Sequence, residues 1–214
     1  ICLLAAGRIH AQVLLAQYNF DNDVTDAVGN HHGTAFNGPV YTTDRFGNPN
    51  GALLLDGSND YISLANAATL QPSTYTYDVW VKPDLNPPGG QAFCLLSIGG
   101  TGGDQMLVNG NSGGIGWSIS GYQNPSGTFG TSALAQPVVN QWYHVTAIVS
   151  VSSAQIYVNG VLVNATGIAA GYTPKYAQAL AYIGRRTNVG PVGPQFFHGA
   201  IDDLKIYSGV NTPL

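Results

Sequence analysis

Hydrophobic residues recur along this chain in short runs, and glycine, asparagine, aspartate and proline separate one run from the next. Residues 142–151 (WYHVTAIVSV) alternate between the two kinds of position, whereas residues 92–98 are almost wholly apolar. Alternation with a period of two predicts a strand with one buried face, and a short apolar run predicts a strand buried on both faces. Further runs that predict strands are residues 13–20, 52–55, 61–64, 76–81, 105–108, 116–120, 181–184 and 200–207.

Residues 155–163 (QIYVNGVLV) predict a hairpin, because Asn159 and Gly160 separate two arms rich in β-branched and aromatic residues. An Asn-Gly pair tolerates positive φ at both central positions of a two-residue type I′ turn. Residues 21–33 contain too many turn-forming residues for a strand and predict a polar loop.

The composition agrees with an all-β chain. There are 28 glycines, and charged residues make up 8% of the sequence, against about a quarter in ordinary globular proteins. Many short strands without an amphipathic helix predict one domain, a two-sheet antiparallel jelly-roll sandwich. The formal net charge is −4 with seven scattered Lys and Arg, which disfavours a nucleic-acid partner.

The first residues, 1–11, resemble the end of a secretory signal peptide that is cut after Ala11. We therefore expect the domain to span 12–209 and residues 210–214 to begin a linker or tail. If Cys2 leaves with the signal, Cys94 is a lone thiol and is expected to pack as a small core residue. No later stretch reaches the roughly 18 apolar residues of a transmembrane helix.

Five segments in a fixed order resemble one known family. They are AQYNFDNDVTDAVGNHHGTAFNG, TTDRFGNPNGALLLDGSNDYISL, TYDVWVKPD, WYHVTAIVSVSSAQIYVNGVLV and GAIDDLKIYSG. Together they resemble the laminin-G-like domains of the concanavalin-A-like lectin/glucanase superfamily, which occur in secreted multidomain bacterial proteins. The resemblance covers residues 16–209 and implies a concanavalin-A-like sandwich. It leaves function open, because the family includes sugar-binding modules, adhesion modules and spacers.

Catalysis is not expected. Glycosidases of the family that the chain resembles use paired glutamates, and all eleven acidic residues here are aspartates. Asp202 and Asp203 are adjacent, so on a regular strand they point to opposite faces. His144 is expected to be a hydrogen-bonded structural histidine.

Aspartates gather in the polar loop and near the C-terminus. The first and last strands of a jelly roll tend to lie side by side, and similar domains often hold a structural Ca²⁺ between these regions. The predicted ligands are Asp21, Asp23, Asn30, Asp202 and Asp203. The alternative is that these side chains cap turns.

Sugar recognition needs an exposed aromatic side chain beside polar groups. Trp117, Tyr122, Gln123 and Arg185 are the candidates, because glycine-rich loops surround the first three. Trp80 and Trp142 are expected to pack in the core. The alternative is that the candidates are half-buried sheet aromatics and a solvated charge.

The resulting hypothesis is a secreted, extracellular or cell-surface recognition and adhesion module, without membrane insertion, that binds a glycan or a protein surface. Other domains of the same parent chain are expected partners. The alternatives are a structural spacer or assembly domain and a polysaccharide-active enzyme.

Overall fold

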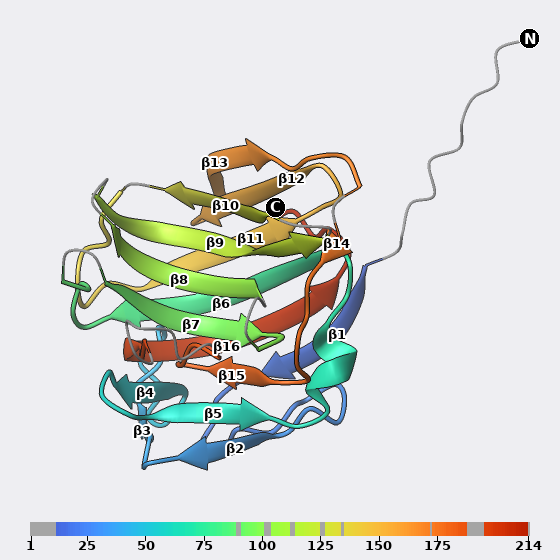
Figure 1. Cartoon of the computed structure of the whole chain (residues 1–214). Helices are drawn as coiled ribbons and strands as arrows, with labels where there is room; N and C mark the ends of the chain where they lie inside the picture. The colour runs from blue at the N-terminus through green and yellow to red at the C-terminus, as the bar shows by residue number, and fades with distance from the viewer. Residues whose placement is uncertain are drawn as a thin grey trace, which may run out of the picture.

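The computed structural model describes residues 12–88, 91–100, 104–111, 114–124, 127–133, 135–171, 173–187 and 195–213. The predicted signal remnant, residues 1–11, lies outside these ranges. Two antiparallel sheets are stacked face to face (Figure 1), so the prediction of an all-β sandwich is confirmed. Within the described ranges, no helix has the length and apolarity that a membrane span requires.

One sheet, called sheet A here, has eight strands. Its order is β13 (Val161–Gly167), β12 (Ser153–Val158), β11 (Tyr143–Val149), β6 (Tyr75–Pro83), β16 (His198–Ser208), β4 (Ala52–Asp56) and β3 (Val40–Thr42). The eighth strand, β1 (Val13–Tyr18), pairs with the second half of β16, next to the segment that pairs with β4. The first and last strands therefore lie side by side, as predicted.

The other sheet, called sheet B, also has eight strands. Its order is β10 (Thr128–Ala133), β9 (Gly114–Asn124), β8 (Asp104–Asn111), β7 (Ala92–Ile98), β15 (Ala181–Ile183), β5 (Tyr61–Leu64) and β2 (Gly33–Phe36). The short strand β14 (Thr173–Pro174) pairs with β9, and η1 (Ala67–Leu70) is a short 3-10 helix.

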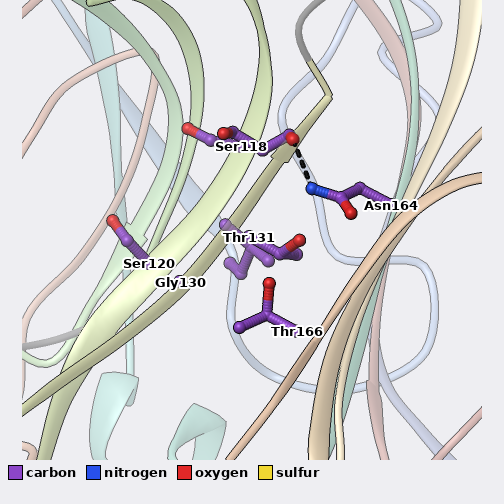
Figure 2. A pocket seen from close by; sticks show the side chains of 8 residues that line it. Ser118, Ser120, Gly130, Thr131, Asn164 and Thr166 are labelled. Carbon is purple, nitrogen blue, oxygen red and sulfur yellow. Dashed lines mark hydrogen bonds between the residues drawn. The ribbon is translucent and has the colours of Figure 1, made fainter. Parts of the chain in front are cut away.

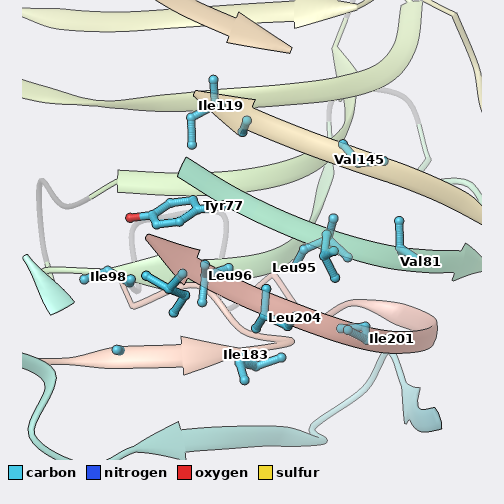
Figure 3. Close-up of a cluster of buried hydrophobic side chains, with 14 of the residues drawn as sticks. Tyr77, Val81, Leu95, Leu96, Ile98, Ile119, Val145, Ile183, Ile201 and Leu204 are labelled. Atoms are coloured by element: carbon cyan, nitrogen blue, oxygen red, sulfur yellow. The ribbon is translucent and has the colours of Figure 1, made fainter. Parts of the chain in front are cut away.

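The core lies between the two sheets (Figure 3), where inward side chains of β6 and β11 meet those of β7, β9 and β15. In β6 the buried residues Tyr77, Val79 and Val81 alternate with the half-buried Asp78 and Trp80. This alternation follows from the period of two in a strand. It gives sheet A an outer face that carries polar and aromatic side chains.

The hairpin between β12 and β13 confirms the predicted turn. Asn159 and Gly160 have φ of 51° and 78°, and Val158 pairs with Val161 on either side of them. The side chain of Asn159 also accepts a hydrogen bond from the backbone N–H of His144, at 2.9 Å. This hydrogen bond therefore holds the turn against β11.

Asp26 organises the polar loop that follows β1. Its carboxylate is 4% exposed and accepts backbone hydrogen bonds from Gln17, Val28 and His31 at 3.0–3.1 Å. Burial alone raises the pKa of a carboxyl group, but these backbone donors lower the pKa of Asp26 to about 2. The loop is thus held by a buried carboxylate that satisfies backbone N–H groups.

Cys94 has no exposed surface, and burial raises the pKa of its thiol to about 12. A thiol that stays protonated in the core is unreactive. The prediction that Cys94 packs as a small core residue is confirmed.

Candidate functional site

The outer face of sheet A holds a groove, called the Trp80 groove here. Trp80 on β6 is in register with His144 on β11, and Asp78 is in register with Thr146. These four side chains share one face because residues two apart on a strand point the same way. The groove is a cavity of about 500 Å³ that is lined by Asp78, Trp80, His144, Asn159, Gly160, Asn211 and Pro213.

A hydrogen-bond network fixes the polar side of the Trp80 groove. His144 Nε2 lies 2.9 Å from Asp78 Oδ1, and the Thr146 hydroxyl donates to Asp78 Oδ2 at 2.7 Å. Both oxygens of the carboxylate are therefore held in place, and each keeps a lone pair for a further donor. The expectation of a hydrogen-bonded His144 is confirmed.

A stack of flat side chains runs from the groove to the neighbouring surface, since Trp80 and His144 line the groove whereas Arg45 and Phe46 lie beside it. The His144 ring lies 5.1 Å from the Trp80 ring, with 26° between their planes. The guanidinium carbon of Arg45 is 4.7 Å from the centre of the Trp80 ring and 4.2 Å from that of Phe46. Phe46 is 72% exposed, so the stack ends in an aromatic face open to solvent.

The predicted roles of the tryptophans were wrong. Trp80 and Trp142, expected in the core, are half-buried residues outside it. Trp117, expected as an exposed platform, is 2% exposed and packs in the core with its ring 5.6 Å from that of Tyr143. The sequence carries the signal that was missed. Trp80 is in phase with Asp78 in TYDVWV, and Trp117 is out of phase with the serines in WSIS.

The remaining candidate ligand residues lie on sheet B. Tyr122 and Gln123 belong to β9, where they pair with Thr128 and Pro174, but their side chains lie outside the described part of the structure. Arg185 directly follows β15 and is half-buried. The structure therefore does not bring Trp117 and Arg185 into the Trp80 groove.

Two adjacent aspartates meet one arginine beside the groove. Arg45 Nη1 lies 2.5 Å from Asp202 Oδ2, and its Nη2 lies 2.6 Å from Asp203 Oδ2. The prediction that the two carboxylates point to opposite faces was wrong, because a β-bulge interrupts the pairing between Asp202 and Lys205. Asp203 has a φ of 46° there, and such a bulge redirects a side chain.

Burial and the neighbouring charge of Asp203 raise the pKa of Asp202 to about 6, although Arg45 opposes the shift. The Asp202 side chain is 4% exposed. Arg45 is therefore the counter-ion on which this buried carboxylate depends.

The positions of these aspartates show whether the predicted ligands could hold a calcium ion together. Asp21 lies with Asp202 and Asp203 at a cavity of about 360 Å³, but Asp23 and Asn30 are not among the residues that line it. The Asp23 carboxylate instead accepts the backbone N–H of Thr25 at 2.8 Å, which is a turn cap. The predicted five ligands do not converge, and in the described ranges no three acidic, histidine or cysteine side chains form a metal-binding group. With Arg45 on the aspartate pair, the arrangement does not fit a calcium ion.

A third cavity, of about 330 Å³, lies among β9, β10 and β13 (Figure 2). Small polar side chains line it, and the amide of Asn164 donates to the carbonyl oxygen of Ser132 at 2.6 Å. It has neither an aromatic surface nor a charged group, so it offers less to a saccharide than the Trp80 groove does.

Comparison with known families gives a match over most of the described chain. The family model Laminin_G_3, described as the concanavalin A-like lectin/glucanases superfamily, matches residues 56–214. The matched range contains β5 to β16 and every lining residue of the Trp80 groove. Among curated proteins, none matches the chain.

Solved structures share the fold. Domain 4 of AbnA, a GH43 extracellular arabinanase from Geobacillus stearothermophilus in complex with arabinotriose, aligns with a TM-score of 0.75 and 24% identity, over 94% of this chain and 95% of that one. A structure of botulinum neurotoxin type C, a toxin whose cell entry depends on interaction with two ganglioside molecules, aligns with a TM-score of 0.65 and 13% identity. The binding domain of botulinum neurotoxin DC in complex with SialylT aligns with a TM-score of 0.66 and 12% identity. The alignments cover 94% of this chain but 49% and 48% of the two toxin chains.

Proposed function

Because this chain belongs to the concanavalin A-like lectin/glucanases superfamily, we propose that it is a non-catalytic recognition module that binds a glycan in the Trp80 groove. The observation that carries the proposal is the groove itself, which places the rings of Trp80 and His144 beside a carboxylate and two asparagines. Sugars are recognised in this way, since their C–H faces pack on aromatic rings while their hydroxyls need fixed hydrogen-bond partners.

The polar groups of the groove suit sugar hydroxyls. Asp78 accepts hydrogen bonds, and the amides of Asn159 and Asn211 both donate and accept them. The carboxylate is already oriented by His144 and Thr146, so little ordering remains to oppose binding. We infer a neutral saccharide here, because Asp78 would repel an anionic one.

The absence of paired carboxylates at the groove supports a non-catalytic role. Asp78 is the one acidic residue among its lining side chains, whereas glycoside hydrolysis uses two carboxyl groups across the scissile bond. The groove also lacks a serine or cysteine next to His144 among those lining residues, so the Asp78–His144 pair has no nucleophile to activate.

The proposal includes an extracellular or cell-surface location, in a longer protein whose other domains are its neighbours. The apolar segment 1–11 supports secretion, and one structural neighbour is a domain of an extracellular enzyme in complex with a trisaccharide. A protein surface is the alternative ligand, because the exposed Phe46 beside the groove also suits a protein contact.

The test is calorimetric titration of the chain with neutral oligosaccharides, arabinotriose among them. Trp80→Ala is expected to weaken binding at least tenfold, since an aromatic residue at the centre of a binding site commonly contributes more than about 1.4 kcal/mol. Asp78→Asn is expected to weaken it as well, because the amide presents one acceptor instead of two.

Trp142→Ala is the matched control, because Trp142 is also half-buried but does not line the groove. Each variant's melting temperature shows whether it is folded. Equal affinity of the wild type and Trp80→Ala would place binding outside the groove. If no neutral oligosaccharide binds the wild type, the proposal fails and the spacer function is favoured.

A further inference from the structure

A second cluster of aromatic and basic side chains lies on sheet B, and we call it the Arg185 platform. It consists of Phe36 on β2, Tyr61 on β5, Tyr182 on β15, Arg185 and Phe196. We propose that the Arg185 platform binds a carboxylate-bearing sugar, such as a uronic acid residue of an acidic polysaccharide. The inference rests on the proposed function only in that its ligand is also a saccharide.

The aromatic part of the platform is a shelf across neighbouring strands. Phe36 and Tyr61 face each other in the register of β2 and β5, with ring centres 4.8 Å apart and planes within 3°. Tyr182 meets Tyr61 edge-on, at 5.4 Å and 75°. Phe36 is 40% exposed, and the other rings of the platform are half-buried. The shelf therefore presents an aromatic surface to solvent on which a sugar ring can pack.

Arg185 is held against this shelf. Its guanidinium carbon lies 4.7 Å from the centre of the Tyr61 ring, 5.1 Å from that of Tyr182 and 5.9 Å from that of Phe196. Cation–π contacts of this kind restrict a long side chain without using its N–H groups. The N–H groups lie in the guanidinium plane and form a fork that matches the two oxygens of a carboxylate.

No acidic side chain neutralises Arg185 in the part of the chain that the structure describes, and its Nε has no hydrogen-bond partner there. Arg186 is likewise without an acidic partner and donates to the side-chain oxygen of Gln195 at 3.3 Å. Arg45, by contrast, contacts two carboxylates. A guanidinium that lies on the platform without an acidic partner in the described ranges, in a chain of net charge −4, indicates an anionic ligand.

The Arg185 platform and the Trp80 groove therefore differ in the charge that is left beside their aromatic rings, because Arg45 next to Trp80 is paired with Asp202 and Asp203. The groove contains Asp78, whereas the platform contains Arg185. A carboxylated sugar is repelled at the first and attracted at the second. The combination of a flat guanidinium with an aromatic shelf selects a planar anion attached to a ring, which is the chemistry of a uronic acid.

The test compares two ligands that differ only in charge, trigalacturonic acid and its methyl ester. The wild type is expected to bind the acid at least tenfold more tightly than the ester, with an affinity that falls as salt is added. Arg185→Gln is expected to remove the preference for the acid. Arg185→Lys is expected to retain part of it, because the charge remains while the fork is lost.

Lys175→Gln is the matched control, because it removes the same charge from an exposed position outside the platform. Melting temperatures show whether the variants are folded. Equal binding of acid and ester by the wild type, or an unchanged preference in folded Arg185→Gln, overturns the proposal.

The same titrations separate this inference from the proposed function. Trp80→Ala is expected to bind trigalacturonic acid as the wild type does, and Arg185→Gln is expected to bind neutral oligosaccharides normally. Failure of the wild type to bind neutral oligosaccharides counts against the groove alone, and failure of the wild type to prefer the acid counts against the platform alone.

Discussion

At the scale of the residue, Asp26 shows how a single buried carboxylate organises a loop. It accepts hydrogen bonds from the backbone on both sides of the loop, and His31 Nδ1 lies 3.0 Å from its second oxygen. The pKa of about 2 means that the ionised form is bound more tightly in the folded chain than in the unfolded one, whose carboxyl titrates near its ordinary value of 3.8. The unfolded state therefore takes up the proton first as the pH falls.

We expect this difference to stabilise the fold by about 2 kcal/mol above pH 4, and to be lost as the pH falls from about 4 towards 2. Asp26→Asn should lower the free energy of unfolding by about that amount at pH 7, because an amide offers one acceptor where the carboxylate offers two. At pH 2 the variant and the wild type should be much closer.

Urea denaturation at both pH values measures the effect, with the exposed Asp21→Asn as the control variant. An equal loss of stability at pH 7 and pH 2 would show that the charge of Asp26 does not matter.

Single residues also show which features of the candidate site can be predicted from the sequence. The side of the sheet on which a tryptophan lies is readable from its phase relative to polar neighbours, as Trp80 and Trp117 illustrate. The pairing of Arg45 with Asp202 is not readable in this way, because 157 positions separate the two residues. The pairing of β16 with β4 within sheet A brings the loop between β3 and β4 to Asp202.

At the scale of the element, strand prediction was most accurate where a strand is central. The runs that became β6, β7, β11 and β16 were all predicted. The sequence did not predict β2, β3, β10 and β14, and the first three of these lie at sheet edges. An edge strand has one neighbour and buries less of its surface, so its hydrophobic pattern is weak. The bulge in β16 was missed although it shifts the alternation, because Ile201 and Leu204 both lie in the core at a spacing of three residues.

The hairpin of β12 and β13 gives a prediction at this scale. Gly160 has a φ of 78°, and a residue with a Cβ in that conformation costs about 1 kcal/mol or more. Gly160→Ala should destabilise the chain by about 1 kcal/mol and weaken glycan binding, because the turn holds Asn159 against His144.

Gly167→Ala is the control, since an added Cβ meets no atom within 4 Å there. Denaturant melts and oligosaccharide titrations measure both effects. Equal stability of the Gly160→Ala and Gly167→Ala variants would show that the turn type is unimportant.

At the scale of the whole molecule, the acidic side chains of the described ranges are largely engaged by the protein. The carboxylates of Asp26, Asp44 and Asp56 accept backbone hydrogen bonds, Asp78 is held by His144 and Thr146, and Arg45 joins the last two aspartates. The sequence showed where the aspartates cluster, but their partners depend on the folded topology. This is why the fold was predictable and the partners of the aspartates were not.

We therefore expect the melting temperature of the wild type to be the same with calcium and with a chelator. Arg45→Gln should destabilise the chain by about 3 kcal/mol, because it leaves the buried carboxylate of Asp202 without a counter-ion. Calcium should then raise the melting temperature of this variant, since a cation that binds only the folded state stabilises it.

Thermal melts of both proteins, with and without chelator, measure these shifts. A drop of several degrees when the wild type meets the chelator would show that calcium binds despite Arg45.

The placement of the two candidate sites has a consequence for assembly. The Trp80 groove lies on the outer face of sheet A, and the Arg185 platform lies on sheet B. Figure 1 shows that the two sheets are stacked on each other. A rigid body that holds one chain on each side has a valency of two, with its contacts directed apart. If both proposed sites bind, such a domain would cross-link neutral polymers to acidic ones, and a mixture of the two polymers would form a network at stoichiometric concentrations and dissolve again in excess protein.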